Sequence, residues 1–210
     1  AVRMFKNQRM NLSEIEGHLK RFRVGIAGAG GLGSNCAVLL ARSGIGTLVI
    51  ADYDRVEKSN LSRQFYFKGQ EGMLKTEALK ENLSRIRPDT NVLIHSLRLD
   101  RNNILDIFSG CDVIVEALDS SEIKEMFIET VQSVLRGIPL IAGSGIAGWG
   151  KNEILKSRKI DETLYVCGDE TSEVSDDLPP LAPRVAIVAG KQANTVVELL
   201  MGKNRNQNLE

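Results

Sequence analysis

Residues 23–52 read RVGIAGAGGLGSNCAVLLARSGIGTLVIAD. The short apolar run at 24–27 is typical of a buried strand, and the run at 48–51 predicts a second one. Between them, a helical pattern continues to Arg42 and ends near Gly44. This order predicts a β-α-β unit, from which open parallel sheets with helices on both faces are built.

The turn after the first predicted strand is suited to close contact with a phosphate. It fits the pattern G-x-G-x-x-G and supplies the glycines Gly28, Gly30, Gly31 and Gly33. Because glycine has no side chain, backbone N–H groups and a helix N-terminus can approach a phosphate. Asp52 ends the second predicted strand, where an acid in such a unit binds a ribose hydroxyl. Together these features predict a nucleotide site, and a tight turn without a ligand is the alternative.

A long polar loop follows the second predicted strand. Residues 53–64 read YDRVEKSNLSRQ, lack helical periodicity and carry many side chains that bind phosphate or sugar. A dinucleotide-binding dehydrogenase would normally turn back into a helix at this point. The loop instead lies at the carboxyl end of a strand, where open α/β sheets bind their ligands.

Lys75 precedes a helix predicted over 76–87. A cation is unfavourable at a helix start, so this position suggests a ligand-binding role. An ordinary surface lysine fits the same pattern.

Strands and helices continue to alternate after this point. The predicted strands are 91–97, 112–118 and 139–142, and the predicted helices are 102–108 and 122–136. Asp119 follows the strand at 112–118. There a carboxylate can hold Mg²⁺ against phosphates, or cap the next helix, or both. At the other end of the chain, Ser13 and Glu16 predict a capping box that opens an N-terminal helix.

The pattern changes in the C-terminal half. A glycine-rich turn at 143–150 leads into a predicted strand at 153–160 without an intervening helix, which indicates antiparallel strands. Residues 167–183 are acidic and proline-rich, and predict a long mobile crossover loop of the kind that is usually functional. A strong helix is predicted over 182–201, with Pro183 near its start. The expected fold is α/β, a doubly wound, Rossmann-like, mostly parallel sheet with antiparallel strands in the C-terminal half.

Length and composition limit the class of protein. The 210 residues suit one α/β domain over 1–210, and 27 basic side chains balance 27 acidic ones. This balance gives no reason to expect nucleic acid or a membrane as partner. With no apolar run of membrane-spanning length and no apolar core of a signal peptide near residue 1, we expect neither a transmembrane helix nor a signal peptide. The three cysteines form no C-x-x-C pair, so we expect neither disulfides nor zinc, and a cytoplasmic location. Cys36 and Cys111 are expected to be inert.

Several motifs together resemble the ubiquitin-activating superfamily, and more narrowly the ThiF/MoeB adenylyltransferases of sulfur-carrier proteins. They are GAGGLGS, ADYD followed by V-x-x-S-N-L-x-R-Q, a lysine before the next helix, ALDSSE, and APRV before the last helix. The resemblance runs from about residue 8 to residue 202. Within that branch, the chain is similar to a compact ThiF-like subgroup.

The resemblance implies a reaction between ATP and the C-terminal carboxylate of a small ubiquitin-like carrier ending in Gly-Gly. The products would be an acyl-adenylate and pyrophosphate, most simply in the thiamine thiazole pathway. Such chemistry needs positioning and charge neutralisation more than a nucleophile.

The same resemblance assigns roles to individual residues. Asp52 would bind the ribose, Arg63 and Lys75 the triphosphate, and Asp119 the Mg²⁺. The remaining nucleotide-site residues would be Asp54, Asn60 and Gln64. Arg9 would reach the neighbouring subunit's site in a homodimer, and Cys167 is the candidate for a covalent thiol.

Three alternatives stay open from the sequence. One is an NAD(P) oxidoreductase, which the glycine pattern alone would permit. Another is a related enzyme that activates a carboxylate on a tRNA base, for which a basic surface would be expected. The third is a non-catalytic scaffold that retains ATP.

Overall fold

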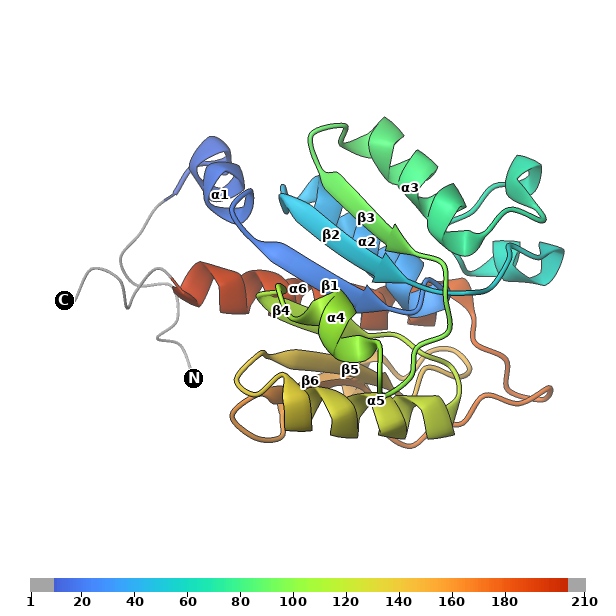
Figure 1. The fold of residues 1–210 in the computed structure, drawn as a ribbon. Coiled ribbons are helices and arrows are strands. Elements are labelled where there is room, and N and C mark those ends of the chain that lie inside the picture. The colour runs from blue at the N-terminus through green and yellow to red at the C-terminus, as the bar shows by residue number, and fades with distance from the viewer. Residues whose placement is uncertain (1–9, 204–210) are drawn as a thin grey trace.

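The computed structural model describes residues 10–203, in which seven strands form one sheet in the order β3-β2-β1-β4-β5-β7-β6 (Figure 1). The strands are β1 Arg23–Ala27, β2 Thr47–Ala51, β3 Asn91–His95, β4 Val113–Glu116, β5 Leu140–Ser144, β6 Lys156–Lys159 and β7 Leu164–Gly168. All neighbours pair in parallel except β6 and β7, which are antiparallel. The predicted α/β sheet with its C-terminal antiparallel pair is therefore confirmed.

Helices cover both faces of the sheet. They are α1 Leu12–Leu19, α2 Gly31–Arg42, α3 Lys75–Ile86, α4 Ile104–Phe108, α5 Ser121–Val134 and α6 Ala182–Gly202. One apolar core joins α1, α2, α3 and α6 to one face, and a second joins α4 and α5 to the other. Successive side chains of a strand point to opposite faces of the sheet. Val24 and Ile26 of β1 therefore pack in the first core, and Ala27 packs in the second.

The chain changes direction beside β1. From β1 it moves through β2 to β3, and then returns to place β4 on the other side of β1. In doubly wound sheets ligands bind at such a switch point, outside the carboxyl ends of the strands. The glycine turn after β1, Asp52 after β2 and Asp119 after β4 all lie at that edge.

Three local predictions were wrong. The cap of α1 is Asn11, paired reciprocally with Glu14, because the carboxylate of Glu16 instead makes a two-pronged ion pair with Arg87. The strand expected at 153–160 is only β6, preceded by the 3-10 helix Asn152–Ile154.

The third error concerns the start of the crossover loop. Residues 167 and 168 belong to the unpredicted strand β7, so the loop begins at Asp169 and ends before α6. A turn at Asp161, whose carboxylate accepts the N–H groups of Thr163 and Leu164, brings β7 beside β6.

The loop at 53–64 also contains a 3-10 helix, Lys58–Ser62. Among the described residues, none of the helices has the length and apolarity needed to cross a membrane.

Candidate functional site

A cavity of about 1280 Å³ runs along the carboxyl edge of the sheet. At one end it is lined by the glycine turn, Asp52, Arg63 and Lys75. At the other end it is lined by residues 143–146, at the carboxyl end of β5, and by part of the crossover loop. One space therefore connects the predicted phosphate turn to the loop that was expected to cover a substrate.

Two glycines of the turn are required by close packing. Gly28 has a φ of +95°, and a Cβ there would lie 2.5 Å from the carbonyl oxygen of Ala117. A Cβ on Gly33 would lie 1.9 Å from the carbonyl oxygen of Gly28, so Gly33 brings α2 against the turn. Gly28, Gly30 and Gly31 line the cavity, whereas Gly33 does not.

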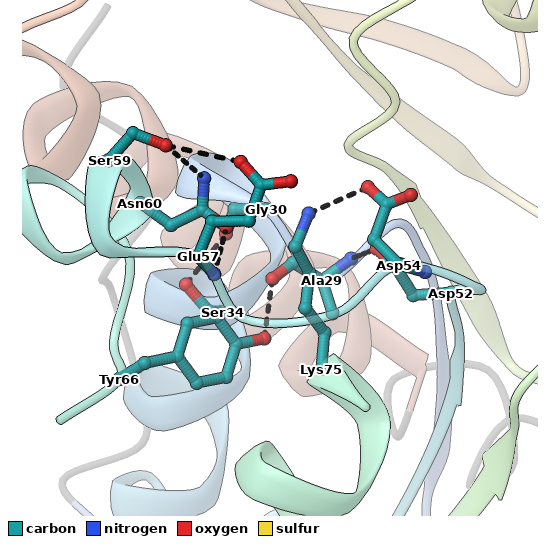
Figure 2. A network of polar contacts seen from close by, with 10 residues as sticks. All are labelled: Ala29, Gly30, Ser34, Asp52, Asp54, Glu57, Ser59, Asn60, Tyr66 and Lys75. Atoms are coloured by element: carbon teal, nitrogen blue, oxygen red, sulfur yellow. Dashed lines mark hydrogen bonds and ion pairs between the residues drawn. The ribbon is translucent and has the colours of Figure 1, made fainter. Parts of the chain in front are cut away.

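The peptide groups of Ala29 are held from two sides (Figure 2). Its N–H donates to Asp52 Oδ2 at 2.6 Å, and its carbonyl accepts the Tyr66 hydroxyl hydrogen at 2.6 Å. The Ser34 hydroxyl donates to the carbonyl of Gly30 at 2.6 Å. The turn is therefore held in shape by side chains from α2, from the residue after β2 and from the 53–74 segment.

Asp52 and Lys75 are both anchored at the cavity wall. Asp52 Oδ1 also accepts the N–H of Asp54 at 2.7 Å, yet burial raises the pKa of Asp52 against these donors and the nearby Lys75. Lys75 is the first residue of α3, and its side chain is only 7% exposed. Its ammonium pairs with Asp54 at 2.7 Å (Figure 2), so Asp54 fixes the cation that faces the cavity.

Arg63 and Gln64 enter the cavity, and Asn60 does not. Arg63 Nη1 donates to the carbonyl of Ser59 at 3.2 Å, which leaves most of the guanidinium donors free. Gln64 is buried, and its Oε1 has no hydrogen-bond partner among residues 10–203. Asn60 caps the 3-10 helix instead, since its Oδ1 accepts the N–H of Glu57 at 3.1 Å.

Asp119 lies in the loop after β4 and faces the cavity. Ser120 occupies the N-cap position of α5, so Asp119 is not the cap of that helix. Within the described part of the chain, Asp119 makes no hydrogen bond or ion pair. Residues 10–203 also contain no group of three or more His, Cys, Asp or Glu side chains that could hold a metal ion. A cation at Asp119 would therefore need most of its ligands from a phosphate-bearing substrate or water.

Comparison with known proteins identifies the chain. The sequence profile of the ThiF family matches residues 6–210. The chain belongs to the ThiF family. Adenylyltransferase and sulfurtransferase UBA4 of Saccharomyces cerevisiae is 30% identical over 197 residues, which cover 90% of this chain and 44% of the relative. The UBA4 protein of Yarrowia lipolytica is 34% identical over 190 residues, covering 88% and 47%. This ThiF-family chain thus spans less than half the length of these curated relatives.

Solved structures share the ThiF-family fold. The tRNA N6-threonylcarbamoyladenosine dehydratase TcdA of E. coli, solved in complex with ATP, superposes with a TM-score of 0.83 at 20% identity, covering 92% of this chain and 91% of TcdA. MccB of E. coli, also solved with ATP, gives a TM-score of 0.67 at 22% identity, covering 89% and 58%. At these identities the likeness establishes the fold alone.

The structure of this ThiF-family chain does not bring Cys167 to the cavity. Cys167 is fully buried in β7, its Sγ lies 3.5 Å from Ser157 Oγ, and burial raises the pKa of its thiol. It was placed at the start of the crossover loop because the apolar residues before it were not recognised as a strand. Cys36 and Cys111 are buried as expected. Arg9 lies outside the described residues.

Three polar residues of this site were missed in the sequence. Tyr66 holds the turn, and Glu116 with Lys124 forms an ion pair of 2.6 Å beside the cavity. A glutamate inside the apolar run at 112–118 was the available signal, because a buried carboxylate needs a partner. Tyr66 had no local signal, since its partner lies in a distant turn.

Proposed function

We propose that this ThiF-family chain uses ATP to adenylylate the C-terminal carboxylate of a small ubiquitin-like sulfur-carrier protein ending in Gly-Gly. The observation that carries the proposal is the single cavity that joins the glycine turn, Arg63 and Lys75 to the entrance between β5 and the crossover loop. The curated relatives are named adenylyltransferases. Their names support this activity for the shared domain.

The nucleotide would occupy the end of the cavity near β1 and β2. Asp52 would accept hydrogen bonds from ribose hydroxyls, since a carboxylate has more acceptor positions than its two N–H donors use. The fixed turn would present backbone N–H groups to phosphate. Arg63 would offer a planar fork to the phosphate oxygens and Lys75 a point charge. Gln64, with its unpaired carbonyl oxygen, would complete this wall.

The charge of the cavity supports a requirement for Mg²⁺. Six carboxylates line it (Asp52, Asp54, Asp119, Glu125, Glu129 and Glu173), against four cations (Arg63, Lys75, Arg98 and Lys124). A triphosphate would add further negative charge to a lining that already has too few cations. The unpaired carboxylate of Asp119 fits an Mg²⁺ ion that takes its other ligands from phosphates and water. Bound there, Mg²⁺ would neutralise charge on the phosphates.

The other end of the cavity would hold the carrier's tail. Its lining from residues 143–146 is small and glycine-rich, which suits an extended Gly-Gly segment. The crossover loop that borders it carries exposed acids, including Glu173, Asp176 and Asp177. A carrier with a basic patch near its tail is therefore the expected partner, and its association should weaken as salt is raised.

The reaction itself requires no protein nucleophile. A carboxylate oxygen would attack the α-phosphorus, the bond from that phosphorus to the bridging oxygen would break, and the electron pair would leave with pyrophosphate. No proton need move, so the residues act by positioning and charge neutralisation. The buried Cys167 is accordingly not proposed to act.

The sequence resemblance alone supports the finer assignments. These are the thiamine thiazole pathway and a homodimer in which Arg9 crosses into the neighbouring site. The expected cytoplasmic location rests instead on the cysteine content.

ATP–pyrophosphate exchange tests the proposed function. Purified chain is incubated with ATP, Mg²⁺ and labelled pyrophosphate, together with each member of a panel of Gly-Gly-ended carriers. We expect exchange that depends on one carrier and disappears when its final glycine is removed. ATP binding without exchange for any carrier would reject the carrier as substrate, and exchange that depends on tRNA would replace it with the tRNA-base reaction. Tight NADH binding without ATP binding would point to an oxidoreductase.

A further inference from the structure

Glu116 is a fully buried carboxylate at the last residue of β4. Its Oε1 accepts the backbone N–H of Leu118 at 2.7 Å, and its Oε2 accepts from Lys124 Nζ at 2.6 Å. Burial raises the pKa of Glu116, against the effect of the Lys124 ammonium. The carboxylate thus joins the loop that bears Asp119 to the first turns of α5.

Lys124 reaches from α5 to the tip of β5. Besides Glu116, its ammonium donates to the carbonyl oxygen of Gly143 at 2.7 Å. An ammonium has three N–H donors, and described residues accept only two of them. The side chain is 24% exposed and lines the cavity, so the remaining donor is available to a ligand there.

Two residues that are hydrogen-bonded to this ion pair, Leu118 to Glu116 and Gly143 to Lys124, lie against residues of the glycine turn. A Cβ on Gly143 would be 2.3 Å from Leu32 Cδ1, in the first turn of α2. A Cβ on Gly28 would be 3.3 Å from the nitrogen of Leu118, whose hydrogen Glu116 accepts. Lys124 therefore lines the cavity from a carbonyl of β5 that packs against the first turn of α2, next to the glycine turn.

Stability alone is a weak reason for this arrangement. Removing two charges from water costs free energy that their attraction often fails to recover, so buried ion pairs can frequently be replaced by apolar residues. Glu116, however, holds the Lys124 ammonium at a fixed point on the cavity wall, and this gives the buried pair a functional explanation. Arg63 and Lys75, by contrast, lie on the opposite side of the turn, with the 53–74 segment and α3.

We propose that Lys124 binds the carboxylate of the acyl substrate through its remaining N–H, and that Glu116 is the residue that positions it. This inference rests on the proposed function. Lys124 would hold one carboxylate oxygen so that the other forms the bond to the α-phosphorus while the bond to pyrophosphate breaks. The ammonium keeps its proton throughout.

Calorimetric titration with two ligands tests this role without a carrier protein. One ligand is ATP, and the other is 5′-O-(N-glycylsulfamoyl)adenosine, a stable mimic of an acyl-adenylate. Lys124→Met keeps an unbranched side chain one atom shorter and removes the charge. The control is Lys80→Met, which changes an exposed lysine of α3 that lies outside the cavity lining.

A second variant is needed in case Lys124→Met does not fold. Lys124→Met leaves Glu116 buried without its cation, which is strongly destabilising. The double variant Glu116→Gln/Lys124→Met removes both charges and keeps the packing, so we expect it to fold. Lys124→Arg retains the charge and should recover part of the binding.

A direct contact predicts a selective effect. In the double variant we expect the acyl-adenylate mimic to bind about tenfold more weakly or worse, the loss typical of a hydrogen bond to a charged group, while ATP affinity changes less than about twofold. Equal losses for both ligands, or no loss for either, would overturn the inference and leave the proposed function standing. Failure of the unmodified chain to bind ATP would overturn both.

Discussion

The backbone of Ala29 is clamped between the side chains of Asp52 and Tyr66. Asp52 accepts its N–H at 2.6 Å and Tyr66 donates to its carbonyl at 2.6 Å. The two side chains come from the end of β2 and from the long loop after it, so the loop that makes the site also fixes the phosphate turn. Both hydrogen bonds are made by the chain itself, so they constrain the backbone of the turn that would receive the phosphates.

Tyr66→Phe should loosen the turn while keeping the ring in place. Tyr66 is buried, so the substitution leaves the Ala29 carbonyl without its partner, at a cost of about 1–3 kcal/mol in the free energy of unfolding. Urea denaturation and ATP titration measure the two consequences. Tyr165→Phe is the control, because the Tyr165 hydroxyl makes no hydrogen bond with any described residue. Equal effects of the two substitutions would contradict the clamp.

Gly33→Ala should be more damaging than its small size suggests. The added Cβ would be 1.9 Å from the carbonyl oxygen of Gly28. The oxygen belongs to the backbone and the Cβ is bonded directly to Cα, so neither atom can rotate away. Overpacking of this kind costs about 1–3 kcal/mol or more. Gly69→Ala is the matched control, since a Cβ there meets no atom within 4 Å. Thermal unfolding of both variants gives the comparison, and a Gly33→Ala protein as stable as the control would refute this packing.

The β-α-β unit and its glycine turn could be predicted because their signals are local. An apolar run, a glycine pattern and an acid at the strand end each depend on neighbouring residues, and the fold confirms their placement. The rule that parallel strands end at one edge predicted the places of Asp119 and of the loop that carries Arg63. Lys75 was indicated by its position at a helix start and by the family resemblance, and it lines the same cavity.

The remaining features depend on contacts between distant segments. Nothing near Tyr66 in the sequence points to Ala29, and nothing near Arg184 points to Asp169. Strand β7 has an apolar run at 164–167, but a run of four residues does not by itself identify a strand, and its pairing with β5 and β6 is what defines it. That error placed Cys167 in a loop, whereas its side chain is buried in the core.

Arg63→Ala should remove most of the ATP–pyrophosphate exchange under the proposed function. Its guanidinium is the least engaged of the cations near the glycine turn, with one hydrogen bond to the Ser59 carbonyl. Loss of one preorganised donor to developing charge typically costs about 100-fold in rate or more. Arg42→Ala, at an exposed position of α2 outside the cavity lining, is the control and should keep normal exchange. Unchanged exchange in Arg63→Ala would disprove the phosphate role.

Asp119→Asn should change the metal requirement more than the affinity for nucleotide alone. The carboxylate has no partner in the described structure, so its removal should not disturb the fold. We expect the Mg²⁺ concentration for half-maximal exchange to rise about tenfold or more, since even changes behind a metal ligand have effects of that size. Asp106→Asn, at an exposed position of α4 outside the cavity lining, serves as the control. The same Mg²⁺ dependence in both variants would remove Asp119 from the proposed metal site.

The ion pair between Asp169 and Arg184 should make the crossover loop sensitive to acid. Both side chains are buried, and Arg184 also donates to the carbonyl of Gly150 at 2.6 Å, so the pair ties the start of the loop to α6 and to the turn after β5. Burial raises the pKa of Asp169, but the N–H groups of Ser172 and Thr171 and the Arg184 guanidinium outweigh it and lower the pKa to about 2.

Since the folded-state pKa of Asp169 lies below its unfolded value of 3.8, its carboxylate stabilises the fold above about pH 4. This contribution, on the order of 2 kcal/mol, should disappear as the pH falls from about 4 towards 2. Urea denaturation of Asp169→Asn and wild type at several pH values would show a stability difference that is largest near neutral pH and shrinks in acid. Asp177→Asn, an exposed acid of the same loop, should follow wild type throughout. A difference that stays constant between pH 5 and pH 2 would mean that Asp169 acts through shape and not through its charge.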